Sequence, residues 1–427
     1  NRLIIDLQNL VDLDLLSAAE IGAGAVPANT NRVDYEAARR FKLPLIDLAA
    51  DRLLQRRGLA VDLYDGTPPR WLKNHANYTA LREISGVPWQ QWPATWSVEG
   101  ADEVLLANPI ARQLRDRAYA IEWLFTRQMR ALSDYCAHIG VQLFGDVPIY
   151  VAGDSADTWA HRNLFLLDHN GHATDVSGVP PDAFSDVGQK WDNPLYDWPA
   201  HAATGFRWWV NRLRRAFELT PIVRIDHFRG LQAFWAIPAT DDDARGGAWQ
   251  PGPGIALFDA IASELGAVDI VAENLGLIDA PVRGLQHDAN LPGMSILQFA
   301  FGAGSDNAYL PHNLPSETTC YTGTHDNNTT LGWWTNCQPR VRDHARRYFG
   351  IDGHDIVWDM VRAAMASVAD RAIVPAQDLL GLGEDGRMNL PGSEGNNWSW
   401  RLLPDQLGSA HSGRLAGLVR LYGRSQS

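Results

Sequence analysis

A repeated unit in residues 141–427 constrains the fold more than any other feature of the sequence. In each repeat a short apolar run is followed by a polar loop and then by a helical pattern. Strands that alternate with helices predict a parallel α/β architecture. We therefore predict a (β/α)8 TIM-type barrel with helical and loop insertions. The predicted strands are Val141–Phe144, Ile222–Ile225, Ile270–Ala272, Ser295–Phe301, Thr319–Tyr321 and Ala372–Pro375.

Four of the loops that follow these runs carry an acidic residue close to the strand end. The four acids are Asp146, Asp226, Glu273 and Asp326. In a TIM-type barrel the active site is built from the loops at the carboxyl ends of the strands. Acids at matching positions of successive units therefore predict that these side chains face one pocket.

Asp226 ends the run Val223-Arg224-Ile225-Asp226, which reads as a buried strand that leads into a loop. A buried carboxylate needs a partner, and Arg224 lies two residues away on the same side of an extended strand. We predict an ion pair that keeps Asp226 ionised and oriented, as a nucleophile requires. A purely structural Asp-Arg pair at a strand end is the alternative interpretation.

Glu273 is the second candidate for catalysis. It follows Asp226 by 47 residues and precedes Asp326 by 53 residues. This spacing predicts that Asp226 and Glu273 follow adjacent strands, with Asp326 two strands further on. Carboxyl groups about 5–5.5 Å apart form the nucleophile and acid/base pair of a retaining glycosidase. The apolar run before Glu273 is expected to raise its pKa, as a proton donor requires; the alternative is an acid at a helix N-terminus.

Composition excludes several other classes of function. The 427 residues carry 37 basic and 50 acidic side chains, for a net charge of −13, without a basic cluster for nucleic acid. No apolar run approaches the roughly 20 residues of a membrane span. The three cysteines are widely spaced, which predicts reduced thiols in a cytoplasmic protein. The 17 tryptophans offer flat faces for sugar rings, although most are expected in the core.

We expect a single catalytic barrel domain over residues 1–427. Within it, residues 8–140 are predicted to form a mostly helical insertion, and residues 152–200 a loop-rich insertion over the active site. The chain starts at Asn1 in what reads as a strand already under way. The N-terminal strands of the barrel are therefore expected to be missing from this chain.

Several motifs identify a family when their order and spacing are taken together. The sequence resembles the 4-alpha-glucanotransferases called amylomaltase or disproportionating enzyme, glycoside hydrolase family seventy-seven. The resemblance covers nearly the whole chain. The matching segments are Trp71-Leu72, Trp89, Trp92-Pro93, Gly145 to Val151, Asp154 to Trp159, Gly178 to Ser185, Gly188 to Trp191, Asn193 to Tyr196, Arg224 to Gly230, Ala272-Glu273, Thr322 to Thr329, Gln377 to Gly381, Arg387 to Asn389 and Pro391-Gly392.

The resemblance implies a role for each matching position. Asp226 would be the nucleophile, Glu273 the general acid/base, and Asp326 the carboxylate that holds hydroxyls of the distorted sugar ring. The implied substrate-binding residues are Arg224, which orients the nucleophile, His325 and Asp146 at the −1 subsite, Trp191 and Phe299 as acceptor-side stacking residues, and Asn389 as a polar contact to the glucan. For Asp146 a turn-stabilising role is an equal alternative. For Phe299 core packing is the preferred interpretation.

The resemblance also implies that Pro181–Gly188 forms a flap that excludes water and favours transfer over hydrolysis. The family usually has Gly at position 192 and Asp at 274 and 328, where this chain has Asp192, Asn274 and Asn328. Neither asparagine replaces a catalytic carboxylate, but each removes a negative charge near the site. We expect this loss to lower the proton affinity of Glu273 slightly.

The predicted activity is a retaining transfer of alpha-1,4-glucan segments between maltooligosaccharides or to glucose. Glycosyl transfer through a carboxylate needs no metal or organic cofactor, and the sequence has no metal-ligand spacing. Alpha-1,4-glucans and glucose are the expected partners, with no nucleic acid and no membrane. Two alternatives stay open: a retaining alpha-glucan hydrolase with water as acceptor, and a non-catalytic or truncated glucan-binding protein.

Overall fold

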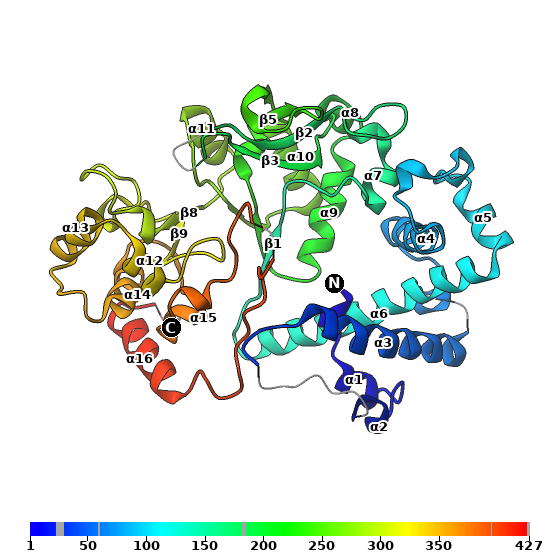
Figure 1. Cartoon of the computed structure of the whole chain (residues 1–427), viewed down its shortest axis with the longest axis horizontal. Coiled ribbons are helices and arrows are strands. Elements are labelled where there is room, and N and C mark those ends of the chain that lie inside the picture. The colour runs from blue at the N-terminus through cyan, green and yellow to red at the C-terminus, as the bar shows by residue number, and fades with distance from the viewer. Residues whose placement is uncertain (23–29, 59, 182–184, 394, 425–427) are drawn as a thin grey trace. The chain divides into compact units, whose positions relative to one another are not determined.

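The computed structural model describes residues 1–427 except 23–29, 59, 182–184, 394 and 425–427. The predicted flap Pro181–Gly188 therefore lies partly outside the described residues. The chain forms two compact units (Figure 1). The first comprises Asn1–Val26, Glu36–Ile270 and Asp279–Ala289, and the second comprises Pro27–Tyr35, Val271–Ile278 and Asn290–Ser427.

The N-terminal part of the first unit is helical. Its longest helix begins at Pro109, a residue that suits a first helical position, and the side chain of Asn108 accepts hydrogen bonds from the backbone N–H groups of Ile110 and Ala111. Leu and Ala side chains of α1, α3 and α6 pack together in one buried cluster. The helices of this part are α1 (Leu7–Asp12), α2 (Ala18–Gly22), α3 (Tyr35–Arg57), α4 (Arg70–Ser85), α5 (Ala101–Ala107) and α6 (Pro109–His138).

A three-stranded sheet in the order β1-β4-β7 follows these helices. β1 (Phe144–Val147) runs parallel to β4 (Ile222–Ile225), and all four residues of β4 are buried. β7 (Asp269–Ala272) is the other neighbour of β4. Asp226 and Glu273 are the first residues after β4 and β7, so the prediction that they follow adjacent strands is confirmed.

A second sheet of the first unit was not predicted. It has the order β3-β2-β5-β6, and its strand pairs are antiparallel. Two of its strands lie within residues 152–200, which were expected to be loop-rich. The strands are β2 (Asp175–Val179), β3 (Gln189–Pro194), β5 (Ala233–Pro238) and β6 (Ala248–Pro251), and the other helices of the unit are α7 (Ala156–Ala160), α8 (Trp198–Ala203), α9 (Arg207–Phe217), α10 (Ile255–Leu265) and α11 (Ala280–Asp288).

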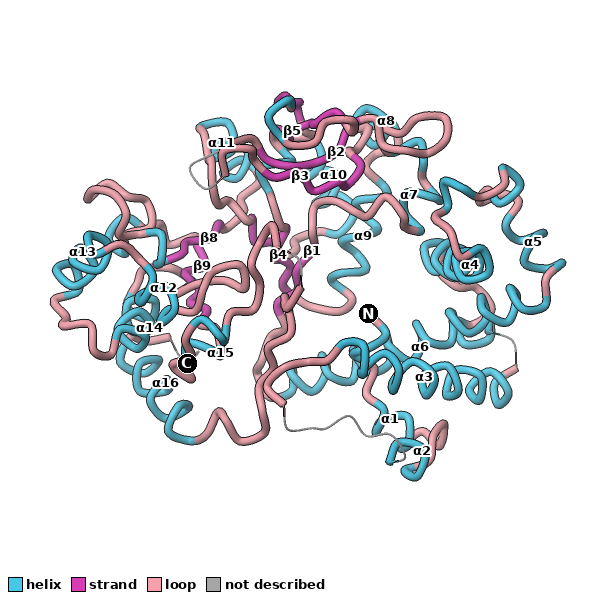
Figure 2. The backbone as a smooth tube through the Cα atoms, viewed as in Figure 1, coloured by secondary structure: helices cyan, strands magenta, loops and turns pink. Residues whose placement is uncertain are grey.

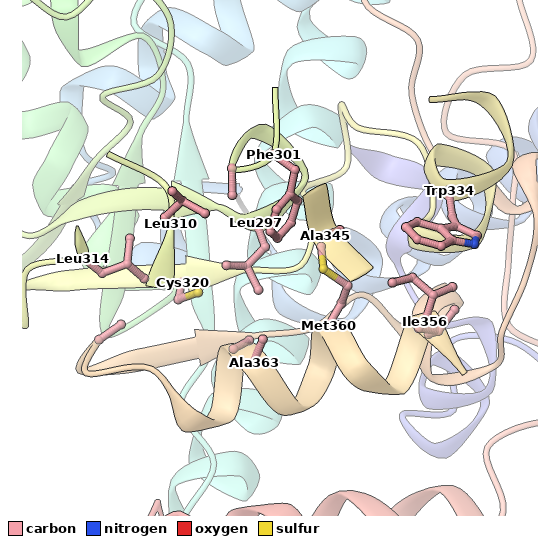
Figure 3. Packing of buried hydrophobic residues seen from close by; sticks show 14 residues of the cluster. Leu297, Phe301, Leu310, Leu314, Cys320, Trp334, Ala345, Ile356, Met360 and Ala363 are labelled. Atoms are coloured by element: carbon pink, nitrogen blue, oxygen red, sulfur yellow. The ribbon is translucent and has the colours of Figure 1, made fainter. Parts of the chain in front are cut away.

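The second unit contains a parallel sheet in the order β10-β9-β8. Its strands are β8 (Gly293–Ile296), β9 (Thr318–Tyr321) and β10 (Arg371–Ile373), and its helices are α12 (Thr330–Asn336), α13 (Pro339–Phe349), α14 (Ile356–Ala366), α15 (Ala376–Leu379) and α16 (Ser409–Leu421). Figure 3 shows a core cluster of this unit, in which Met360 and Ala363 of α14 pack near Leu297, Leu310 and Cys320.

Every predicted strand overlaps an observed strand, but three have shifted boundaries (Figure 2). β1 starts at Phe144, because Val141 follows Gly140, whose φ is 75°, and its side chain is 48% exposed. β8 ends at Ile296, where a 3-10 helix, Leu297–Phe299, replaces the predicted strand end. β10 begins one residue early and ends at Ile373.

The strands predicted for the barrel fall into two sheets of three in the described part of the chain, so a closed ring of eight is not seen there. None of the helices in that part is both long enough and apolar enough to span a bilayer.

Candidate active site

In the first unit, Arg224 of β4 connects two carboxylates. Arg224 and Asp146 are directly paired across β4 and β1, which brings their side chains to the same face of the sheet. Arg224 Nη1 donates to both Oδ1 and Oδ2 of Asp146 at 2.8 Å. Arg224 Nη2 lies 2.7 Å from Asp226 Oδ1. The predicted Arg224–Asp226 ion pair is therefore confirmed, and the contact of the same guanidinium with Asp146 is an addition to it.

The burial of the three residues differs in a useful way. The Arg224 side chain is 9% exposed, whereas the carboxylates of Asp146 and Asp226 are 45% and 40% exposed. A buried guanidinium is fixed by packing and presents a planar array of donors. The two carboxylates keep contact with solvent, where a substrate can reach them. Asp146 lies inside β1, so the alternative role in a turn is wrong.

His227 and Trp191 lie next to the Asp226 carboxylate along the chain and in space. His227 adopts a left-handed backbone with φ of 52° and opens the 3-10 helix Phe228–Leu231. The indole ring of Trp191, in β3, meets the His227 ring edge to face at 4.9 Å between centroids. Burial lowers the pKa of His227 to about 4, although the charge of Asp226 opposes this. The imidazole is thus neutral at pH 7, and Trp191 gains an aromatic neighbour beside the acid.

In the second unit, Glu273 and Asn274 begin the loop after β7. Glu273 Oε1 accepts a hydrogen bond from the backbone N–H of Leu275 at 3.0 Å. Asn274 Oδ1 accepts from the N–H of Met294, in β8, at 2.8 Å. The side chain of Asn274 thereby fastens the Glu273 loop to the neighbouring strand.

Asp326 lies in a turn between β9 and α12 and has several partners. Asn389 Nδ2 donates to Asp326 Oδ1 at 2.6 Å, and His325 Nε2 lies 3.3 Å from Oδ2. Arg387 Nη2 donates to the Asp326 backbone carbonyl at 2.8 Å. Asn389, predicted as a contact to the glucan, therefore also fixes the rotamer of Asp326.

Two aromatic residues of the second unit differ from expectation. Phe299 is 38% exposed, so the prediction of core packing is wrong. Its ring meets that of Tyr309 edge to face at 5.7 Å. Phe299 ends the 3-10 helix Leu297–Phe299, where the chain leaves β8 and turns the ring outward. Exposure of a flat ring agrees with a role in stacking on sugar.

The sequence analysis missed Arg387 and Trp398 as parts of this site. Arg387 was quoted as part of a motif, but without a role. The Trp398 ring lies 5.0 Å from the His325 ring, and Trp398 has a positive φ of 57°. Both partners lie more than 60 residues beyond the turn that they contact, so no local pattern could have identified them.

The predicted site residues thus form two groups, each within one unit. The first contains Asp226, Arg224, Asp146 and Trp191, and the second contains Glu273, Asp326, His325, Asn389 and Phe299. Within the described part of the chain, no three or more His, Cys, Asp or Glu side chains are arranged to hold a metal ion.

Comparisons with known proteins identify the family. The family model described as 4-alpha-glucanotransferase matches residues 1–406. The chloroplastic/amyloplastic 4-alpha-glucanotransferase of Arabidopsis thaliana is 41% identical over 435 residues, which cover 99% of this chain and 75% of the plant protein. The 4-alpha-glucanotransferase of Thermus thermophilus is 39% identical over 433 residues, 98% of this chain and 85% of the relative.

A solved structure agrees with these matches. The amylomaltase of Streptococcus agalactiae in complex with acarbose superposes with a TM-score of 0.92 at 30% identity, over 100% of this chain and 87% of the amylomaltase. The present structure therefore has the amylomaltase fold, a TIM-barrel type. From its sequence and its structure together, this chain belongs to the 4-alpha-glucanotransferase family, glycoside hydrolase family 77.

Proposed function

We propose that this protein moves alpha-1,4-glucan segments between maltooligosaccharides, or to glucose, through a covalent glycosyl-aspartate intermediate. The observation that carries the proposal is the ion pair of buried Arg224 with Asp226 at 2.7 Å. It supplies what a carboxylate nucleophile needs, an ionised group held in one orientation. Family membership supports the choice of a glucan as the substrate.

Asp226 is the proposed nucleophile. Because Oδ1 accepts from Arg224, we assign the attack on the anomeric carbon to Oδ2. The new bond joins Oδ2 to C1 while the bond from C1 to the leaving 4-oxygen breaks. Glu273 transfers its proton to that oxygen, so the leaving glucan departs as a neutral alcohol.

The second half of the reaction reverses these roles. The Glu273 carboxylate accepts the proton of an acceptor 4-hydroxyl, whose oxygen attacks C1 and releases Asp226. We assign the moving proton to Oε2 of Glu273, because Oε1 accepts the backbone N–H of Leu275. Transfer to an acceptor sugar instead of water requires exclusion of water, for which residues 152–200 remain the proposed cover.

Asp326 and His325 are proposed to bind the hydroxyls of the sugar ring that distorts during the reaction. The contacts from Asn389 and Arg387 support this role, since they fix both the carboxylate and its backbone. Contacts that strengthen as the ring flattens lower the barrier without tightening ground-state binding. Trp191 and the exposed Phe299 are the proposed stacking surfaces for glucan units.

The setting of the reaction follows from the same proposal. Maltooligosaccharides, starch or glycogen chains are the expected donors, and the cytoplasm is the proposed compartment. Cys136, Cys320 and Cys337 are free thiols, which suits a reducing environment, although some relatives are chloroplastic. Because the amylomaltase of S. agalactiae forms a complex with acarbose, we also expect this protein to bind acarbose.

Incubation with maltotriose tests the proposal. A ladder of longer oligosaccharides together with glucose is expected, and Asp226→Asn is expected to abolish it. Asp343→Asn is the matched control, because Asp343 lies on an exposed helix in an ion pair with Arg347 and is 64% exposed. New reducing ends without a ladder would show a hydrolase. Binding of maltotriose without products would show a non-catalytic protein.

A further inference from the structure

The loop that carries His325 and Asp326 is closed at both ends by one buried carboxylate. Thr322 follows the last residue of β9, and Thr330 is the first residue of α12. Both contact Asp378, from the short helix α15. We infer that Asp378 is a positioning residue, which sets the place of Asp326 by holding together the two ends of the loop from Thr322 to Thr330.

The contacts of Asp378 leave little freedom. Its Oδ2 accepts the hydroxyl of Thr322 at 2.6 Å and the hydroxyl of Thr330 at 2.7 Å. Its Oδ1 accepts the backbone N–H of Thr330 at 2.7 Å. All three bonds are short, as charge-assisted hydrogen bonds are. One group thus connects residues 56 and 48 positions earlier in the chain.

Asp378 is only 1% exposed, so it does not contact a glucan in solution. Burial raises the pKa of its carboxyl group, and the three hydrogen bonds oppose that rise. A buried carboxylate is costly, and a well-packed apolar side chain would often be at least as stable. Its cost is offset by the order it imposes on the loop, which places its value in geometry.

The loop between the two ends is tight enough to transmit a displacement. Asn327 Oδ1 accepts from both the N–H and the hydroxyl of Thr324 at 2.9 Å, which places His325 and Asp326 at the centre of a turn. Gln298 Nε2 donates to the carbonyl of Asn328 at 2.9 Å. A Cβ atom at Gly323 would lie 2.6 Å from the same Gln298 amide, so the loop has no room to shift there.

Since Asp378 acts through Asp326, this inference rests on the proposed function and predicts a particular coupling. A displacement of about 1 Å in a catalytic group lowers a rate by about 100-fold. We expect Asp378→Asn to lower kcat for maltotriose by about 10- to 100-fold with KM within about threefold, because one of two acceptor oxygens is replaced by a donor.

The decisive measurement is a double-mutant cycle on the dissociation constant of acarbose, which needs no turnover. Asp378→Asn is expected to weaken acarbose binding by about tenfold in the wild-type background. In the Asp326→Asn background the same change should alter it by less than about twofold. A general loss of folded protein would weaken binding equally in both backgrounds, so the cycle separates positioning from a merely structural effect.

Hydroxyl variants keep the test open if Asp378→Asn does not fold. Thr322→Val and Thr330→Val each remove one donor to Asp378, whereas Thr330→Ser retains both donors and should restore wild-type kinetics. Thr319→Val is the matched control, since Thr319 is fully buried in β9 and its hydroxyl has no hydrogen-bond partner among the described residues.

The outcomes distinguish this inference from the proposed function. A wild-type protein that neither binds acarbose nor converts maltotriose would overturn the proposed function. An active wild-type protein in which the effect of Asp378→Asn is the same with and without Asp326 would overturn the role of Asp378 alone. Wild-type kcat in both threonine-to-valine variants would do the same.

Discussion

Replacement of Arg224 by methionine tests the central claim about the nucleophile. Methionine has a similar length and stays apolar in a buried position, so the change removes charge and donors with little change in packing. Three hydrogen-bonding contacts are lost, two to Asp146 at 2.8 Å and one to Asp226 at 2.7 Å. Asp226 then has no fixed orientation from this side chain, and the two carboxylates lose their shared cation.

The structure sets the size of the effect. A hydrogen bond to a charged group contributes about 1.5–3 kcal/mol. Because Asp146 and Asp226 are 45% and 40% exposed, water screens these contacts, and about 1.5 kcal/mol for each carboxylate is appropriate. A change of about 1.4 kcal/mol is tenfold in rate, so Arg224→Met should lower kcat/KM by about 100-fold. Arg224→Lys keeps the charge without the fork and should lose about tenfold.

Initial rates of glucose release from maltotriose measure the effect, with circular dichroism and thermal unfolding to establish that each variant is folded. Arg245→Met is the control, because Arg245 is 67% exposed and pairs only with Asp243 among its described acidic neighbours. It should keep wild-type kcat/KM. A folded Arg224→Met variant within twofold of the wild-type value would refute the assignment of Arg224 as the group that orients the nucleophile.

Three further outcomes are expected. Asp192→Gly should raise the free energy of unfolding by up to about 1 kcal/mol in urea titration, because Asp192 has a φ of 60° and its contact with Lys190 is largely exposed; a lower stability than Asp192→Ala would contradict this. Burial lowers the pKa of His201 to about 4 from 6.5, so the unfolded state binds the extra proton and the protein loses stability as pH falls through this range. His201→Phe should flatten that loss in thermal unfolding at pH 4–7, whereas an unchanged pH dependence would mean that another group is responsible. Phe299→Ala should raise KM for maltotriose by about 3- to 10-fold with kcat nearly unchanged, since stacking is worth about 1 kcal/mol, and an unchanged KM would exclude Phe299 from glucan binding.

The core of the nucleophile site could be predicted from the sequence because its signal is local. β4 was predicted with its observed bounds, since four consecutive apolar or paired residues bordered by a loop indicate a buried strand. Arg224 and Asp226 lie two residues apart, so the alternation of a strand alone brings them to one side. The ion pair therefore followed from the residues without knowledge of the fold.

Contacts set by register and by long loops could not be predicted in the same way. The pairing of Asp146 with Arg224 depends on the register of β1 against β4, which are 78 residues apart. The hydrogen bond from Asn389 to Asp326 spans 63 residues. The antiparallel sheet was missed because β3 has the sequence Gln-Lys-Trp-Asp-Asn-Pro, in which apolar and polar residues do not alternate. There pairing with β2 overrides a weak local preference.

The two asparagines that replace family aspartates show how charge and geometry can be separated. Asn274 Oδ1 accepts from the N–H of Met294, and Asn328 Oδ1 accepts from the N–H of Thr329 at 2.9 Å. An aspartate oxygen would accept the same bonds, so neither replacement changes how its loop is fastened. What changes is the charge, since two negative groups are absent from the loops that carry Glu273 and Asp326. In this chain the positions of the catalytic acids are therefore maintained by backbone hydrogen bonds that a neutral amide serves as well as a carboxylate.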